Sequence, residues 1–439
     1  MAIYDQNFVD ILNKELVPAL GCTDPGAFGL TAAIAREHAP GELVSIEIEG
    51  SALVVGGIQG VGIPNSGGQR GGMLCAAMGY YGGDSSLGLE VLRTVTKEDL
   101  KKAEELAASG KITLSIVPID QCPATTYLKT TVKSKDHVGV CAVASSHGNV
   151  VYISEDDTII MDKIEETRAT ENLAHLDLSW FTIENAYNFS KNYPMDKLPI
   201  IAQAIELNTE LAAEGLRNPY GMQVALTLKE NVEKGIVSDD EVNYILRWAI
   251  AGADARMGGA DFAAMSNAVS GNQGVMVTMA PIAAGDYIKA DEETKFRGAL
   301  FANLMNLYTK YMTKEFCHYP PQCYCSTMAP AAAAAGVAFV HGYSVKEIID
   351  LVRSSVNNIA GTACDGAKPG CAFKMYTGLC GALQAMFLAK KGITAQSYDG
   401  LCDDDIGVTF DNLYRFQKEC MLPMADVIAK INLEQGAFI

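Results

Sequence analysis

Residues 112–155 decide the fold class: ITLSIVPIDQCPATTYLKTTVKSKDHVGVCAVASSHGNVVYISE. Four runs within this stretch are rich in β-favouring residues, at 112–119, 125–134, 138–146 and 149–155, and turn residues separate them. Such runs are typical of neighbouring β-strands. The stretch therefore predicts a sheet in this part of the chain.

The sequence on either side adds a strand before this stretch and long helices after it. Residues 42–56 include LVSIEIEGSALVV, which alternates apolar and polar residues as a half-buried strand does. After about residue 173 strand signals almost vanish and helical periodicity takes over. We therefore predict an α+β protein with a mixed α/β domain over residues 1–174 and a mostly α-helical domain over residues 175–439. A chain of 439 residues exceeds what a single core usually organises.

The composition indicates a protein that binds a small molecule. The formal net charge is −18 and the sequence pI is near 4.8. Such a field repels nucleic-acid backbones and anionic membrane surfaces. The longest apolar run, residues 328–340, has about 13 residues, whereas a membrane-spanning helix needs about 20. We expect no nucleic-acid partner and no membrane partner.

The amino terminus and the cysteines indicate the compartment. Asp5 and Asp10 lie near the start and no basic segment precedes an apolar run, so no signal peptide is expected. Twelve cysteines in 439 residues are too sparse for a disulfide scaffold. We expect a cytoplasmic protein with reduced thiols, and a homodimer is the default assembly.

Two groups of cysteines stand apart from the isolated ones, CHYPPQCYC at 317–325 and CDGAKPGC at 364–371. Each lies in a turn that leads into an alanine-containing helix, where backbone N–H groups can hydrogen-bond to sulfur. The spacing leaves three interpretations open: an iron–sulfur cluster, a zinc site with help from His318, and buried core cysteines. The candidate metal ligands are Cys323, Cys325, Cys364 and Cys371.

Two further segments could bind an anion. Residues 254–274, DARMGGADFAAMSNAVSGNQG, place amides beside glycines, which suits a pocket that grips a carboxylate or an ammonium group. A solvated loop with helix caps would give the same pattern. The loop PNSGGQRGG at 64–72 lacks the spacing of a nucleotide-binding loop, but its arginine could bind a carboxylate bidentately. The candidate substrate-binding residues here are Arg70, Arg256, Asn267, Asn272 and Gln273.

The turn GCTDP at 21–25 predicts the start of a helix, because Thr23 and Asp24 are favoured capping residues and Pro25 is favoured in the first turn. Cys22 lies just before this helix start, where its pKa is expected to be lowered. His147 lies at a strand turn, where a lone histidine is either structural or available to a ligand.

Together these segments resemble the L-cysteine desulfidase family, a group related to the α-chain of iron–sulfur L-serine dehydratases. The resemblance is carried by GCTDP, the glycine loop, SHGN at 146–149, the 254–274 segment, the alanine-rich run after Cys325, and CDGAKPGCAFK at 364–374. It covers essentially the whole chain.

The resemblance implies a [4Fe–4S] enzyme that removes a leaving group from a small amino acid. The most direct expectation is that L-cysteine is converted into pyruvate, ammonia and hydrogen sulfide. Motif matching assigns Cys364 and Cys371 as cluster ligands. It leaves the third ligand between Cys323, which we favour, and Cys325. The family's amino-terminal cysteine, proposed as the base, corresponds to Cys22.

Asp24 and His147 complete the candidate substrate-binding set. Relatives often carry glutamate at the position of Asp24, so this chain keeps the charge with a shorter reach. Two other functions remain open. One is L-serine or L-threonine dehydration, with hydroxide as the leaving group. The other is a non-catalytic amino-acid-binding protein, zinc-stapled or metal-free.

Overall fold

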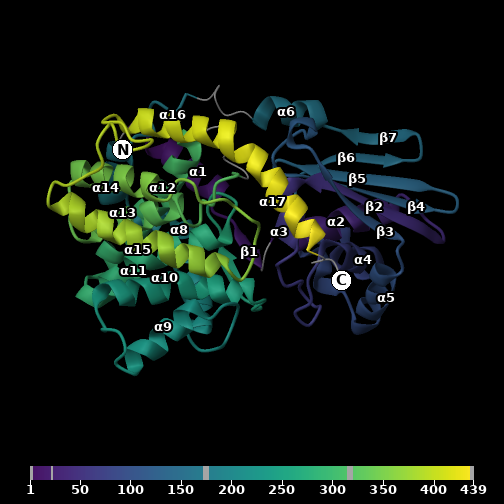
Figure 1. The fold of residues 1–439 in the computed structure, drawn as a ribbon, viewed down its shortest axis with the longest axis horizontal. Helices are drawn as coiled ribbons and strands as arrows, with labels where there is room; N and C mark the ends of the chain where they lie inside the picture. The colour runs from purple at the N-terminus through teal and green to yellow at the C-terminus, as the bar shows by residue number, and fades with distance from the viewer. Residues whose placement is uncertain (1–2, 21–22, 172–176, 314–319, 436–439) are drawn as a thin grey trace.

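The computed structural model describes residues 3–20, 23–171, 177–313 and 320–435, and it confirms an α+β fold. One six-stranded sheet and its covering helices form one part of the molecule, and a large set of helices forms the other (Figure 1). The division into domains at residues 174 and 175 stays a prediction. Within the described residues, no helix is both long and apolar enough to cross a membrane.

The six-stranded sheet contains the strands expected from residues 112–155. Its spatial order is β3-β2-β4-β5-β6-β7; β2 and β3 run parallel and all other neighbours are antiparallel. Buried and half-buried residues alternate along β4, as its sequence pattern predicts. The strands are β2 (Leu43–Ser51), β3 (Ile112–Val117), β4 (Tyr127–Ser134), β5 (Val138–Ala144), β6 (Val150–Glu155) and β7 (Thr158–Asp162).

Helices cover one face of the sheet. Helix α2 (Thr23–Glu37) packs on β4 and β5, and α4 (Gly72–Gly82) and α5 (Lys97–Ala108) lie outside it (Figure 1). A short helix, α6 (Ile164–Glu171), follows the last strand. Cys75 and Cys141 are fully buried in this core, as isolated cysteines commonly are.

The strand expected over residues 42–56 is too long. Strand β2 ends at Ser51, and residues 52–58 form helix α3 (Ala52–Ile58). Every residue of α3 is buried. An uninterrupted apolar run fits a buried helix as well as a buried strand, so its pattern could not separate the two.

The second part is helical, and α11, α12 and α13 form its interior; nearly every residue of α13 and most residues of α11 and α12 are buried. Its helices are α7 (Ile183–Asn192), α8 (Pro199–Gly215), α9 (Val224–Glu233), α10 (Glu241–Met257), α11 (Gly271–Ile288), α12 (Glu292–Met312), α13 (Met328–Val340), α14 (Val345–Asn358), α15 (Cys371–Lys390), α16 (Ile406–Phe416) and α17 (Leu422–Glu434).

Both ends of the chain tie the two parts together. Helix α1 (Asp5–Glu15) packs within the helical part, where Phe8 and Leu12 join the core. Glu15 forms a buried ion pair with Lys310 of α12 and accepts a hydrogen bond from Tyr311 Oη at 2.8 Å. At the other end, α17 crosses to the sheet-containing part and packs on α3 (Figure 1).

A short two-stranded sheet brings the beginning of the chain to the 254–274 segment. Strand β1 (Pro18–Leu20) pairs antiparallel with β8 (Ala263–Met265). Ser266 reinforces this pairing, because its backbone N–H and its hydroxyl both donate to the carbonyl oxygen of Val17, at 2.9 and 2.6 Å. The residues just before the GCTDP turn therefore lie beside the polar segment.

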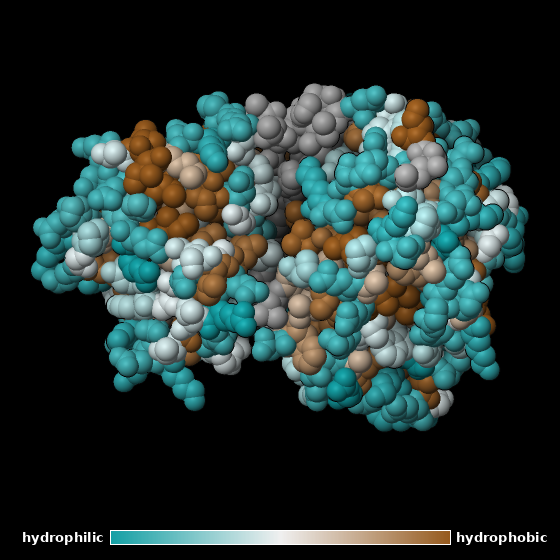
Figure 2. Space-filling model, turned by 180° about the vertical axis from the view of Figure 1, so that it is seen from behind, coloured by the Kyte–Doolittle hydropathy of each residue, from teal (hydrophilic) through white to brown (hydrophobic). Residues whose placement is uncertain are grey.

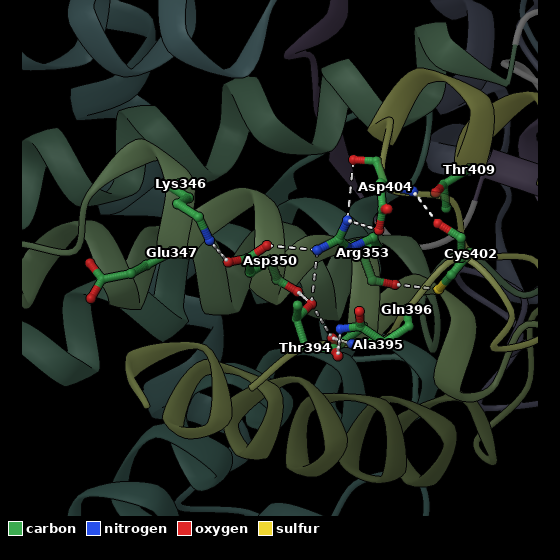
Figure 3. A network of polar contacts seen from close by, with 12 residues as sticks. Lys346, Glu347, Asp350, Arg353, Thr394, Ala395, Gln396, Cys402, Asp404 and Thr409 are labelled. Atoms are coloured by element: carbon green, nitrogen blue, oxygen red, sulfur yellow. Dashed lines mark hydrogen bonds and ion pairs between the residues drawn. The ribbon is translucent and has the colours of Figure 1, made fainter. Parts of the chain in front are cut away.

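A polar network joins α14 to the loop between α15 and α16. Arg353 pairs with Asp350 at 2.8 Å and donates to the carbonyl oxygen of Asp404 at 3.2 Å (Figure 3). Lys346 pairs with the other carboxylate oxygen of Asp350 at 2.6 Å.

On the face seen in Figure 2, hydrophobic residues gather in patches on both parts of a surface that is mostly hydrophilic.

Candidate active site

A small cavity of about 110 Å³ brings together segments that lie far apart in the sequence. The start of α2 and the turn after β5 contribute residues from the sheet-containing part. The end of α10, the start of α11 and the two cysteine loops contribute the rest. Its lining residues are Thr23, Asp24, His147, Arg256, Ala268, Val269, Ser270, Asn272, Gln273, Pro320, Gln322, Cys323, Tyr324, Cys325, Cys364, Gly366, Ala367 and Cys371.

Backbone hydrogen bonds hold the two cysteine loops side by side. Gln322 and Ala363 form an isolated antiparallel β-bridge. On either side of it, the Cys323 N–H donates to the Thr362 carbonyl oxygen at 2.8 Å, and the Cys364 N–H donates to the Pro321 carbonyl oxygen at 2.9 Å. The bridge thus places two candidate ligands next to each other although about 40 residues separate them.

One backbone donor points at a sulfur of the second loop: the N–H of Lys368 donates to Cys371 Sγ at 3.4 Å. In the first loop, the hydroxyl and the backbone N–H of Ser326 both donate to the carbonyl oxygen of Cys323, at 3.0 and 2.9 Å, and so fix the turn. Hydrogen bonds to sulfur are a general feature of cysteine-ligated iron–sulfur clusters.

Cys323 and Cys371 are buried, Cys325 and Cys364 are half-buried, and the four thiols influence one another. Burial, together with the nearby Cys323, raises the pKa of Cys371 to about 11. Burial also raises the pKa of Cys325 well above its usual value, and the other three cysteines add to the shift. No group of three or more histidine, cysteine or acidic residues that could hold a metal ion is found within the described ranges.

Lys374 lies next to the cysteine loops from the first turns of α15. Its ammonium pairs with Asp365 and donates to the Ala363 carbonyl oxygen at 3.2 Å. Burial raises the pKa of the Cys323 thiol, and the positive charge of Lys374 opposes this increase. The lysine therefore both closes the second loop and lowers the cost of negative charge on sulfur.

The second cysteine loop is seated directly on α3. Gly366 has φ of +92°, and a Cβ at this position would lie 2.5 Å from the Gly56 carbonyl oxygen. A larger residue would therefore push the loop away from the sheet-containing part, in addition to straining the backbone.

Arg256 and Asn272 also line the cavity, from the end of α10 and the start of α11. Arg256 is buried, and its Nη1 donates to Asn272 Oδ1 at 3.1 Å. Its Nε has no hydrogen-bond partner, and no acidic side chain pairs with it, among the residues that the structure describes. The guanidinium of Arg256 packs closely against Gly271. A Cβ at position 271 would lie 2.4 Å from Arg256 Nε, so a larger residue would displace the arginine. A buried cation without an acidic partner is costly unless a ligand supplies the negative charge.

The turn between β8 and α11 is strained. Asn267 and Ser270 form an antiparallel bridge around Ala268 and Val269, whose φ angles are +51° and +60°. Positive φ is unusual for any residue with a Cβ and especially for a β-branched one. Both residues line the cavity. Backbone strain of this kind is concentrated at functional sites.

Gln273 lines the cavity, whereas Asn267 lies one step behind it. Gln273 Oε1 accepts a hydrogen bond from Asn306 Nδ2 at 3.0 Å. Asn267 is fully buried; it donates to Asn303 and accepts from Asn306. Asn267 therefore supports the turn from behind and is not part of the lining.

His147 joins the cavity from the turn after β5. Its Nδ1 lies 3.1 Å from Thr23 Oγ1, and its Nε2 lies 3.4 Å from Asp24 Oδ1. Both Asp24 and His147 are buried. The imidazole is thus held against the first turn of α2, whose amino-terminal end favours negative charge.

The cavity includes nine of the twelve residues that the sequence proposed for the site. Asn267 is close behind it, and Arg70 is exposed and does not line it. Cys22 and His318 lie outside the described residues, although Thr23, the neighbour of Cys22, is part of the lining. Two residues were not predicted: Gln322, whose β-bridge with Ala363 joins two distant segments, and Lys374, whose side chain closes the second cysteine loop.

An α+β fold with a buried thiol-lined cavity defines a protein with a site for a small ligand. The family model described as "Serine dehydratase alpha chain" matches residues 86–429, well over half of the chain. The chain therefore belongs to the serine dehydratase alpha chain family, which is the coarser part of the expected resemblance. Its assignment to the L-cysteine desulfidases stays a prediction.

Its similarity to individual relatives extends over nearly the full length. It is 31% identical to a UPF0597 protein of Oleidesulfovibrio alaskensis over 433 residues, which is 97% of each chain. A UPF0597 protein of Photobacterium profundum is 32% identical over 407 residues, or 92% of this chain and 93% of the relative. These names state no substrate.

Proposed function

We propose that this chain is an iron–sulfur-dependent lyase that eliminates hydrogen sulfide from L-cysteine, giving pyruvate and ammonia. One observation carries the proposal: a single small cavity is lined by four thiols and also by a buried arginine without an acidic partner within the described residues. Membership of the serine dehydratase alpha chain family supports a lyase acting on a small amino acid.

We propose a [4Fe–4S] cluster as the cofactor, with the cysteines that line the cavity as its ligands. We assign Cys323, Cys364 and Cys371 as ligands, because the β-bridge aligns the first two and a backbone N–H donates to the sulfur of the third. Cys325 has a different neighbour, since its sulfur lies 3.6 Å from Ser270 Oγ in the turn before the substrate-binding amides. A cluster bound by three thiolates would offer an open iron as a Lewis acid for the leaving group.

The protein's own residues orient the amino acid. Arg256, Asn272 and Gln273 line the cavity, and their N–H donors would hold the carboxylate. Asp24, on the first turn of α2, carries the negative charge that would attract the ammonium group. Burial would strengthen both interactions by excluding water from them.

Cys22 is our candidate for the base that removes the Cα proton. A thiol just before a helix amino terminus has a lowered pKa, which favours the thiolate that proton removal requires. Loss of the proton and cleavage of the Cβ–S bond give aminoacrylate and HS⁻. Aminoacrylate then tautomerises to the imine, and water hydrolyses the imine to pyruvate and ammonia.

L-Serine dehydration is the second candidate, because the matching family model describes a serine dehydratase chain. The same residues would hold serine, and hydroxide would leave instead of HS⁻. Measuring sulfide release from L-cysteine and pyruvate release from L-serine with the same anaerobic preparation separates the two. A preparation that binds either amino acid without converting it, and that holds no iron after anaerobic reconstitution, would indicate the non-catalytic alternative.

A further inference from the structure

A chain of buried amide side chains leads from the interior of the helical part to the cavity. Asn306 Nδ2 donates both to Gln273 Oε1 at 3.0 Å and to Asn267 Oδ1 at 2.8 Å. Asn267 Nδ2 donates to Asn303 at 2.8 Å, and Asn303 Nδ2 donates to Thr278 Oγ1 at 3.2 Å. All five residues are at most 5% exposed. Of the five, only Gln273 lines the cavity.

A backbone carbonyl fixes the direction of this chain of hydrogen bonds. Asn267 Nδ2 also donates to the backbone oxygen of Asn303 at 3.0 Å, and a carbonyl oxygen can only accept. The amide nitrogen of Asn267 must therefore face Asn303, and its Oδ1 must face Asn306. Asn306 then has to present Nδ2 at this contact, and the same nitrogen donates to Gln273.

The fixed direction leaves Gln273 with a donor for the cavity. Its Oε1 is occupied by Asn306, and no described residue accepts a hydrogen bond from its Nε2. Asn306 Oδ1 is buried without a hydrogen-bond partner within the described ranges. Leaving such an oxygen unpaired is unfavourable, which is consistent with an orientation imposed by the neighbours of Asn306.

We propose that Asn306 is a positioning residue that holds Gln273 with its amide N–H₂ toward the ligand, so that Gln273 donates to the carboxylate of the bound amino acid. The inference rests on the proposed function, because it takes a small amino acid as the ligand. Asn306 lies outside the cavity and acts only through Gln273. The ligand class is an amino acid with a free carboxylate.

Asn306→Asp tests this role by reversing the direction of the last hydrogen bond. The introduced carboxylate cannot donate, so Gln273 turns its Nε2 toward residue 306 and presents Oε1 to the cavity. An acceptor then faces the substrate carboxylate. We expect KM for L-cysteine to rise roughly tenfold or more, the effect of one hydrogen bond to a charged group, with kcat within about twofold of the wild-type value.

The decisive readout is the preference between L-cysteine and L-cysteinamide, measured as the ratio of their dissociation constants by calorimetry. A carboxamide can donate to an acceptor, whereas a carboxylate cannot. Both Asn306→Asp and Gln273→Glu should shift this ratio toward the amide by roughly tenfold or more. A general loss of packing would weaken both ligands together and leave the ratio unchanged.

Asn303→Asp is the matched control. It places the same charge in the same buried network, it can still accept from Asn267, and Asn303 does not contact Gln273. For Asn303→Asp, the ratio of the dissociation constants of L-cysteine and L-cysteinamide should stay at the wild-type value. If the wild-type protein binds L-cysteine but Asn306→Asp leaves the ratio unchanged, Asn306 does not position Gln273. If only Gln273→Glu shifts the ratio, the role of Asn306 is likewise refuted. A wild-type protein that binds neither L-cysteine nor L-serine would instead refute the proposed function.

Discussion

Replacing Arg256 by methionine should weaken substrate binding and, at the same time, leave the fold as stable as before or more stable. Arg256 is 6% exposed, and its one hydrogen bond within the described residues is to Asn272. The substitution removes a buried positive charge that no acidic residue offsets, and methionine retains much of the apolar volume.

The two expected magnitudes follow from that environment. Loss of a hydrogen-bonded ion pair with the substrate carboxylate should cost about 1.5–3 kcal/mol, or roughly 10- to 150-fold in KM. The free energy of unfolding should stay within about 1 kcal/mol of the wild-type value or increase, because a desolvated charge has been removed. Steady-state kinetics and urea unfolding of the same preparation measure both.

Arg353→Met provides the matched control, because Arg353 is equally buried but pairs with Asp350 (Figure 3). Its loss leaves a buried carboxylate that only the exposed Lys346 still neutralises. We expect a destabilisation of about 3 kcal/mol and an unchanged KM. The reasoning is refuted if Arg256→Met destabilises the protein like Arg353→Met while KM stays at the wild-type value.

Three more predictions concern pH, the amino-terminal helix and the ligand set. Burial raises the pKa of Asp254 to about 6, so the folded state is destabilised progressively as the pH rises from about 4, the usual carboxyl pKa, to about 6. Asp254→Asn should be close to wild type in stability near pH 4 and about 3 kcal/mol more stable near pH 7.5, which urea unfolding at both pH values measures. An equal difference at both pH values would contradict this. Lys310→Met should cost about 3–5 kcal/mol by stranding the Glu15 carboxylate, and adding Glu15→Gln should restore most of the loss, as denaturant titrations of the single and double variants will show. Cys323→Ser should abolish iron binding after anaerobic reconstitution, whereas Cys325→Ser should retain it, and the reverse result would exchange their roles.

The fold class could be predicted from the sequence because strand alternation and helical periodicity are local signals. The five strands expected before residue 156 are all present, with the one over 42–56 ending early, and β7 was missed. The apolar residues 52–58 carry no such period, and their helical state depends on tertiary burial.

The residues of the site could be predicted from the sequence where chemically distinctive residues are concentrated in short segments. The two cysteine loops and the 254–274 segment contribute most of the lining. The sequence could not predict that the two cysteine loops lie side by side, because this depends on the bridge between Gln322 and Ala363, which pairs distant segments. Asn306 was not predicted, because its role depends on hydrogen bonds to Gln273 and Asn267 in a distant segment.

A polar stripe in α12 could have identified Asn306. Asn303, Asn306 and Lys310 lie at spacings of three and four residues in a helix whose other interior residues are mostly apolar, so they share one face. All three are buried. Each meets a polar group on another element, which is a stronger sign of a specific network than any one of them alone.

Anaerobic reconstitution followed by parallel assays of L-cysteine and L-serine tests whether the chain is an iron–sulfur-dependent cysteine lyase. We expect about four iron atoms per chain, with visible cluster absorbance, and faster sulfide release from L-cysteine than pyruvate release from L-serine. A protein that stays colourless and iron-free under these conditions, and that releases neither product, would contradict this expectation.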